Sequence, residues 1–221
     1  GKIWLYDEML ASELPDDPWV ATALLRYFPG KLQQKYAAHM ARHPLKREII
    51  ATHVLNSMVN RVGSTFVHRL TETTGARAHE VVRAYLLTRE VFAFVPLWQS
   101  IEALDNKVPD AIQAEMVIEA GRLIVRAANW FLRSSRLAAP MEPTIEHFRP
   151  GVEAIYGRLN ELVDAPAAAH IEALASGWER AGVPGEVARR VAALETLFAA
   201  LDIAEVAANT GRAAETVAGA Y

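Results

Sequence analysis

The sequence predicts an all-α protein, a multi-helix bundle of about ten to twelve helices. Alanine, the strongest helix former, makes up about one residue in six. Apolar residues recur at helical spacing over most of the chain, and the alternation typical of β-strands is nearly absent. Prolines also stand at the start of many apolar-periodic segments, where the first helical position tolerates them.

These signals predict the elements in order along the chain. We expect helices near residues 18–28, 31–42, 45–73, 78–94, 96–105, 109–134, 143–148, 151–163, 167–181, 184–200, 202–209 and 213–221. The helix over 45–73 is the longest of them, because apolar residues repeat every four positions from Ile50 to Leu70. The one strand-like run, 91–95, lies inside a helical pattern and is predicted as helix.

The helices could form one bundle or two lobes. The segment from Ser134 to Pro143 is richest in turn residues, so we expect a lead-in over 1–17, a larger helical lobe over 18–135 and a smaller one over 136–221. Gly75 and Gly211 each follow a helical pattern and are predicted C-caps of a repeated helical hairpin. The second copy of that hairpin stops at Tyr221, which predicts a truncated last helix.

Composition excludes several classes of protein. The chain has no Cys, which excludes a disulfide scaffold, thiolate catalysis and sulfur-based metal sites. No apolar stretch approaches the length of a membrane span and no signal peptide opens the chain, so we predict a cytoplasmic protein with no membrane partner. The chain begins at Gly1 without an initiator Met, which indicates a piece of a longer protein.

The small net charge of −3 conceals an uneven distribution. Residues 31–90 carry ten Lys and Arg against four Asp and Glu, whereas residues 91–221 carry 11 against 17. A basic middle segment could contact nucleic acid, a phosphate-bearing ligand or an acidic partner surface. The interpretation we favour is neutralisation within the same fold by the acidic remainder.

The familiar enzyme signatures are absent. No two glycines are separated by a single residue, which excludes a G-x-G-x-x-G dinucleotide loop, and no phosphate loop, H-E-x-x-H or G-x-S-x-G motif occurs. His39 and His43 share a helix face without a third ligand nearby, and Glu115 and Glu119 are expected on a solvated surface. The sequence therefore offers no catalytic, cofactor-binding or metal-binding residue.

One polar line within the predicted long helix is informative. Thr52, Asn56, Asn60 and Gly63 fall on one line beside the apolar face. A glycine inside a helix costs about 1 kcal/mol relative to alanine, so we expect another element to pack closely there. The line could be a structural polar seam, which we favour, a contact with another domain or subunit, or a ligand site.

A nucleic-acid module is also considered. Ala207, Gly211 and Val217 have the spacing of a helix-turn-helix. The surrounding segment carries three acidic residues against Arg212, a net charge of −2, and a recognition helix near phosphates needs the opposite sign. This charge argues against nucleic acid as a partner.

Extended, collinear segments carry a more specific signal. The sequence resembles the C-terminal region of the large bacterial NAD-specific glutamate dehydrogenases over nearly its whole length. The segments that carry the resemblance are Ser12–Pro18, Leu25–Pro29, His43–Thr52, Val59–Phe66, Ile101–Asn106 and Leu201–Ile203.

The resemblance implies a parent enzyme of amino-acid catabolism that oxidises L-glutamate to 2-oxoglutarate and ammonia and passes hydride to NAD. In that family the chemistry belongs to a catalytic domain upstream, so no catalytic or cofactor residue is carried over. We expect a non-catalytic domain, inactive alone and without a cofactor of its own, in a parent that uses NAD and is a homo-oligomer.

On this interpretation the domain packs on the catalytic and N-terminal regions of the same polypeptide. The candidate contact residues are Arg47, Asn56, Asn60 and Arg61. The alternative functions are a helical ligand-sensing regulatory domain and the helix-turn-helix nucleic-acid binder.

Overall fold

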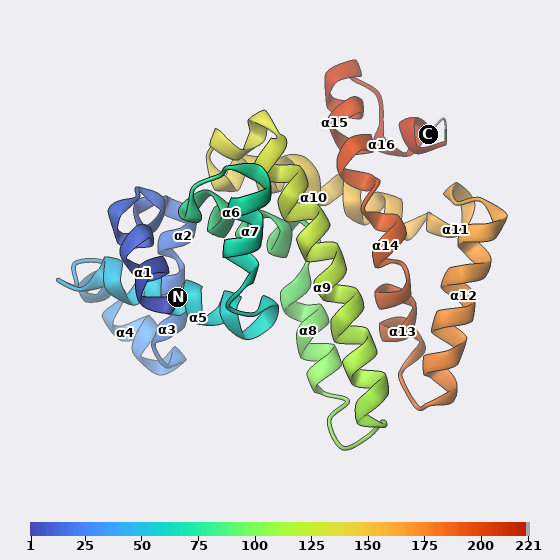
Figure 1. The fold of residues 1–221 in the computed structure, drawn as a ribbon, viewed down its shortest axis with the longest axis horizontal. Coiled ribbons are helices and arrows are strands. Elements are labelled where there is room, and N and C mark those ends of the chain that lie inside the picture. Colours follow the sequence, from blue (N-terminus) through green and yellow to red (C-terminus); the bar gives the residue numbers. More distant parts are fainter. Residues whose placement is uncertain (220–221) are drawn as a thin grey trace. The chain divides into compact units, whose positions relative to one another are not determined.

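A computed structural model describes residues 1–219 and confirms the predicted all-α class. Helices joined by short turns make up the described chain, and it contains no β-strand (Figure 1). The helical segments are more numerous than predicted, because turns or kinks divide several of the expected helices. The helices belong to two compact units, and the chain passes between these units more than once.

Unit 1 comprises Gly1–Leu87 and Ala128–Thr144. Its core forms where α5 packs against α1 and α3, with large side chains such as Met9, Met58, Phe66 and Tyr85 fully buried. Its elements are α1 (Lys2–Ala11), the 3₁₀ turn η1 (Leu14–Asp16), α2 (Pro18–Ala21), α3 (Ala23–Tyr27), α4 (Gly30–Met40), α5 (Lys46–Val62), α6 (Phe66–Thr74), most of α7 (Ala78–Val91), the end of α9 (Asp110–Arg133), the 3₁₀ turn η2 (Ser135–Ala138) and the start of α10 (Met141–Gly157).

Unit 2 comprises Thr88–Ala127 and the chain from Ile145 onward. Its core includes Phe92, Phe94, Phe148 and many alanines, and α12 packs along α13. Besides the remainder of α7, α9 and α10, it holds α8 (Phe94–Glu102), α11 (Leu159–Leu162), α12 (Ala165–Arg180), α13 (Gly185–Ala192), α14 (Leu194–Leu197), α15 (Ala200–Thr210) and α16 (Ala214–Ala218). The predicted boundaries of the lead-in and the two lobes stay a prediction.

The single helix predicted over 45–73 is wrong. The chain forms α5 and α6 instead, separated at Gly63, whose φ of +80° and ψ of 165° end α5. The apolar repeat every four residues continues across the break because both helices bury it, as Met58 and Phe66 show. A repeat of buried positions therefore does not require one continuous helix.

Other helix boundaries also differ from the predictions. No helix is predicted before residue 18, but α1 forms there and buries Leu5 and Met9. It predicts a helix start at Pro150, yet this proline lies inside α10. The run from 184 to 200 divides into α13, α14 and the start of α15.

The predicted caps at Gly75 and Gly211 are confirmed, and Asp17 also caps a helix. The Asp17 carboxylate accepts hydrogen bonds from the backbone N–H groups of Trp19 (2.9 Å) and Val20 (3.3 Å), so it caps α2. Gly75 and Gly211 both adopt the left-handed conformation that ends a helix, with φ of +73° and +67°. The predicted truncation of the last helix concerns residues 220–221, which lie outside the described residues.

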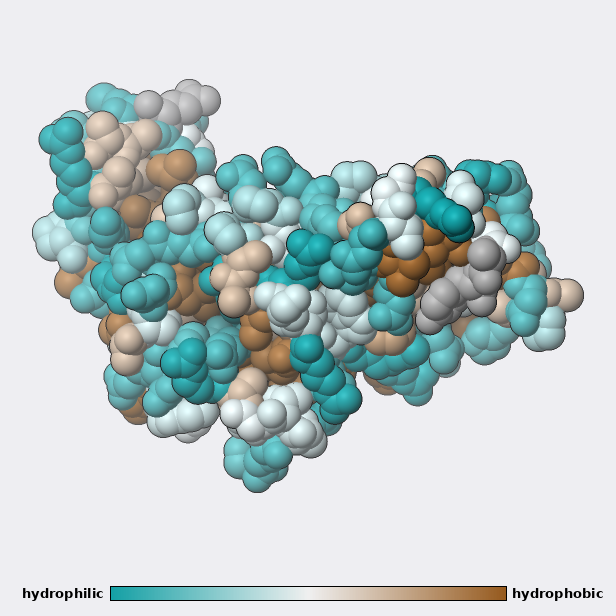
Figure 2. Space-filling model, turned by 90° about the horizontal axis from the view of Figure 1, so that it is seen from above, coloured by the Kyte–Doolittle hydropathy of each residue, from teal (hydrophilic) through white to brown (hydrophobic). Residues whose placement is uncertain are grey.

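The surface of the molecule mixes hydrophilic residues with hydrophobic ones, as Figure 2 shows for one face. Between residues 1 and 219 no helix combines the length and apolar character needed to span a membrane.

Candidate functional site

The polar line predicted along 52–63 lies on the outer side of α5. Thr52, Asn56 and Asn60 are all exposed, and a Cβ built on Gly63 would meet nothing within 4 Å. The predictions of a polar seam buried within this chain and of close packing at Gly63 are therefore wrong. Gly63 is present because its positive φ favours glycine. Contact of this line with another domain or subunit stays a prediction.

Of the two candidate arginines, Arg47 is engaged within its own unit. Its Nη2 donates to the backbone carbonyls of Leu10 and Ser12, each at 2.8 Å, and its Nη1 pairs with the Asp16 carboxylate. Arg47 therefore fastens the end of α1 and the turn η1 to α5. Arg61 stands in the last turn of α5 and is half-buried.

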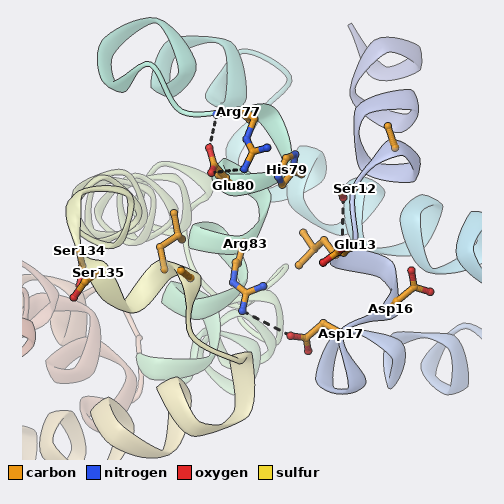
Figure 3. A pocket seen from close by; sticks show the side chains of 14 residues that line it. Ser12, Glu13, Asp16, Asp17, Arg77, His79, Glu80, Arg83, Ser134 and Ser135 are labelled. Carbon is orange, nitrogen blue, oxygen red and sulfur yellow. Dashed lines mark hydrogen bonds and ion pairs between the residues drawn. The ribbon is translucent and has the colours of Figure 1, made fainter.

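Unit 1 contains a pocket of about 980 Å³. Three separate segments line it: residues 11–17 from the end of α1 through η1, residues 77–83 at the start of α7, and residues 134–138 around η2. Figure 3 shows Arg77, His79, Glu80 and Arg83 on the α7 side, with Asp17 opposite Arg83. The pocket is thus assembled by the fold from parts that are remote in sequence.

Arg83, on α7, contacts Asp17 of the first segment and Ala139, the residue that follows the third segment. Its Nη2 hydrogen-bonds to the carbonyl of Ala139 and lies 3.7 Å from Oδ2 of Asp17, and its Nε is buried without a hydrogen-bond partner. Burial lowers the pKa of Arg83, and the negative charge of Asp17 opposes this. Because one carboxylate at this distance satisfies a largely buried guanidinium only in part, the pocket can accept a further hydrogen-bond acceptor near Arg83.

Arg77 and Glu80, near the start of α7, form a second charged pair in the lining of the pocket. Glu80 accepts the backbone N–H of Arg77 at 2.7 Å and its guanidinium at 3.0 Å. The hydrogen bond from Arg77 lowers the pKa of Glu80. Between them in sequence, His79 is half-buried, and burial followed by the positive charge of Arg77 lowers its pKa. His79 therefore favours its neutral form.

The pocket combines both signs of charge and lacks an assembled nucleophile. Ser12 donates to the Met9 carbonyl and accepts the Leu14 N–H, and Ser134 accepts the Arg136 N–H, so both hydroxyls serve local turns. Among the described residues, the exposed Glu13 makes no ion pair. Such an arrangement suits binding of a small polar ligand with both charges better than bond-breaking chemistry.

Among residues 1–219, the other candidate residues are not arranged to bind a metal or another ligand. His39 is exposed and His43 half-buried, with His43 Nδ1 accepting the Leu45 N–H at 3.1 Å. Glu115 accepts the Trp178 indole N–H at 3.1 Å, and Glu119 pairs with Arg122. No cluster of three or more potential metal ligands occurs over residues 1–219.

The helix-turn-helix spacing does correspond to a helical hairpin. Helices α15 and α16 pack together across Gly211, and Ala207 of α15 is buried. The charges on this hairpin remain acidic apart from Arg212, so its surface is a poor match for phosphates.

The pocket residues were missed by the sequence reasoning. Neither His79 nor Asp17 was among the candidate site residues. Arg83 stands in a run of apolar positions on α7 and gave no spacing signal. No pattern could have linked residues 17, 83 and 139, because their proximity exists only in the folded unit.

Comparisons with known proteins identify the family. The family described as "Glutamate dehydrogenase, C-terminal" matches residues 1–221. The NAD-specific glutamate dehydrogenase of Pseudomonas aeruginosa is 40% identical over the whole chain, and that of Halomonas elongata is 37% identical over 99% of it. The corresponding protein of Mycobacterium tuberculosis is 32% identical over 91% of the chain.

The chain spans only 12–14% of the length of these relatives. The match over the full chain agrees with the resemblance carried by the collinear segments of the sequence. The chain belongs to the glutamate dehydrogenase C-terminal family and corresponds to the C-terminal domain of NAD-specific glutamate dehydrogenases.

Proposed function

We propose that this chain is a non-catalytic domain of an NAD-dependent glutamate dehydrogenase that packs against other regions of the same polypeptide. The parent reaction is the oxidation of L-glutamate by NAD to 2-oxoglutarate, ammonia and NADH. The observation that carries the proposal is the family match over all 221 residues. It is supported by a sequence without a dinucleotide loop and by the small share of the relatives' length that the chain covers.

The polar line on α5 is the proposed contact surface. The solvated face of a helix usually carries charged residues, whereas Thr52, Asn56 and Asn60 are neutral and exposed. Amide side chains of this kind can hydrogen-bond across an interface without the cost of burying a charge. Arg61 follows at the end of the same helix, and Arg47 supports the surface from within unit 1.

The test uses the full enzyme that contains this domain. Replacing Asn56 and Asn60 by lysine places two charges on the contact surface, and we expect lower glutamate-dependent NAD reduction or a changed oligomer size. The matched control replaces Ala169 and Ala173, which are also exposed and four apart on a helix, by lysine. We expect this control to leave both measurements unchanged.

A second variant tests whether Arg61 contributes to the contact. Arg61→Ala should weaken assembly or activity, whereas Arg69→Ala, which removes an exposed arginine of the same unit, should not. Unchanged activity and oligomer size in the Asn56/Asn60 and Arg61 variants would remove α5 from the proposal. Glutamate-dependent NAD reduction by the 221-residue chain alone would overturn the non-catalytic assignment.

The pocket in unit 1 supports a second function, that of a ligand-sensing regulatory domain. Its paired charges and the incompletely satisfied Arg83 favour a small polar ligand. Thermal unfolding of the chain with glutamate, 2-oxoglutarate, NAD or free nucleotides tests this function, because a ligand that binds the native state raises the melting temperature. The shift should be lost in Glu13→Ala and Arg77→Ala, and no shift with any of these compounds would remove them as ligands.

A further inference from the structure

Helix α4 is exposed along nearly its whole length. Met40 is the buried residue among its described side chains, while Leu32 and Tyr36 are 41% and 39% exposed, and the helix is kinked at Tyr36 (φ −122°, ψ 16°). An isolated helix of 11 residues is marginal in water and owes its stability to packing of an apolar face. The outer face of α4 therefore has the character of an unfilled interface.

The charged residues on and around α4 are all basic. Residues 18–47 include six Lys and Arg and no Asp or Glu. Lys31 and Lys35 lie beside Leu32 and Tyr36, and Lys35 Nζ stands 5.2 Å from the centre of the Tyr36 ring. Neither lysine makes an ion pair with another described residue. The basic face is defined here as Lys31, Leu32, Lys35, Tyr36 and His39.

Unit 2 carries a surface of opposite charge and similar apolar character. The acidic corner, defined as residues 102–119, joins the end of α8 to the first half of α9 and holds five Asp and Glu against Lys107. Val117 and Ile118 within it are 45% and 54% exposed. Gln113 Nε2 donates to the Ile101 carbonyl at 2.8 Å, which fixes α9 against α8 near the turn that joins them (Figure 1).

We propose that two copies of this chain associate through the basic face of one copy and the acidic corner of the other. The apolar residues of each surface supply area to bury, and the charges around them select the orientation. Lysines and tyrosine on α4 would meet carboxylates and aliphatic side chains of α9. The contact is heterologous, since the two surfaces belong to different units.

The charge of the two units argues for a second copy as the partner. Unit 1 has 13 Lys and Arg and nine Asp and Glu, which give a net charge of +4. Unit 2 has 10 Lys and Arg and 17 Asp and Glu, which give a net charge of −7. The ion pairs of Arg47, Arg77 and Arg83 are all made inside unit 1 and leave the basic face uncompensated. One chain thus displays both halves of a complementary pair.

Sedimentation of the wild-type chain over a range of concentrations is the first test. We expect reversible self-association that weakens at least about tenfold when the salt is raised from about 50 to about 500 mM, because screening removes the attraction between exposed charges. A chain that stays monomeric at low salt and high concentration overturns the proposal.

Charge reversal tests the named surfaces. Lys31→Glu with Lys35→Glu makes both surfaces acidic, and Asp105→Lys with Asp110→Lys brings the acidic corner to a net charge of zero, so neither variant should associate with itself. Mixing the two variants should restore association, because the unchanged basic face of one then meets the unchanged acidic corner of the other. Circular dichroism of each variant verifies that it is folded.

A matched control keeps the total charge change and moves it elsewhere in unit 2. Glu172 and Glu186 are exposed on α12 and α13, and Glu186 stands in a first helical turn as Asp110 does. Glu172→Lys with Glu186→Lys should associate like the wild type. Self-association that survives either charge reversal, or that the control abolishes equally, overturns the assignment to these surfaces.

Discussion

The two compact units hold their helices together by partly different contacts. In the first part of unit 1 the helices are short, and arginines tie distant segments by donating to backbone carbonyls, as Arg47 does to Leu10 and Ser12. In unit 2 the helices approach closely over small residues: a Cβ on Gly151 would lie 3.4 Å from that of Ala204. Unit 2 also has such an arginine, Arg149, which donates to the Glu90 carbonyl at 2.9 Å.

This difference predicts which kinds of substitution should destabilise each unit. A guanidinium that spans two or three segments cannot be replaced locally, because its partners are left buried without a hydrogen bond. A close helix contact tolerates loss of a polar group but not added volume, since packed interiors have little free space. The following substitutions test this contrast in order of expected effect.

The largest effect is expected for Arg83→Ala in unit 1. The change removes the hydrogen bond to the Ala139 carbonyl and leaves the Asp17 carboxylate, which is 11% exposed, without its cation. Breaking a largely buried pair costs about 3 kcal/mol of unfolding free energy. Urea unfolding measures the loss. Arg77→Ala, which removes an exposed arginine of the same pocket, should change the free energy of unfolding little. Equal losses in the two variants would contradict the stabilising role of the Arg83 contacts.

The next effect is expected in unit 2 for Gly151→Leu. Its side chain would enter the space held by Ala204 and Ala214, and overpacking of this kind costs about 1–3 kcal/mol. Gly177→Leu on α12 is the matched control, since a Cβ there meets nothing within 4 Å. We expect the control to be as stable as the wild type or slightly more stable by thermal unfolding. A tolerated Gly151→Leu would show that small residues do not set the helix spacing.

A smaller effect is expected at the turn that divides α5 from α6. Gly63→Ala places a side chain at φ +80°, a conformation that costs a non-glycine residue about 1–2 kcal/mol. Gly121→Ala, inside α9 and without close neighbours, should instead stabilise the chain by about 0.5–1 kcal/mol. Thermal unfolding distinguishes the two signs. A neutral Gly63→Ala would mean that α5 can continue through this position.

The smallest effect is a pH dependence from His79. Burial and Arg77 lower its pKa in the folded chain, so the unfolded chain binds the proton more readily. Stability from this residue is therefore present above its ordinary pKa near 6.5 and is lost as the pH falls through the lower folded value. Urea unfolding from pH 7 downward should show a flatter dependence for His79→Gln. Parallel curves would exclude His79 as a contributor and leave Glu80, whose pKa is lowered by the hydrogen bond from Arg77, to account for the loss.

The fold class and several helix ends follow from local physical chemistry. Helical spacing, alanine content and the caps at Asp17, Gly75 and Gly211 are properties of neighbouring residues, and the structure confirms them. Local signals were insufficient at α1, whose alternation of apolar and polar residues is irregular, and at Pro150, where tertiary packing retains a helix through a proline.

By itself, the sequence determined that this protein is all-α, that it resembles the C-terminal region of glutamate dehydrogenases, and that it carries no dinucleotide loop. Tertiary structure alone decided that Arg83 meets Asp17 and Ala139, that the amides of α5 face outward, and that α4 keeps its lysines and tyrosine exposed. The reason is physical: periodicity and capping depend on residues a few positions apart, whereas burial and charge pairing depend on segments that meet only when the chain folds.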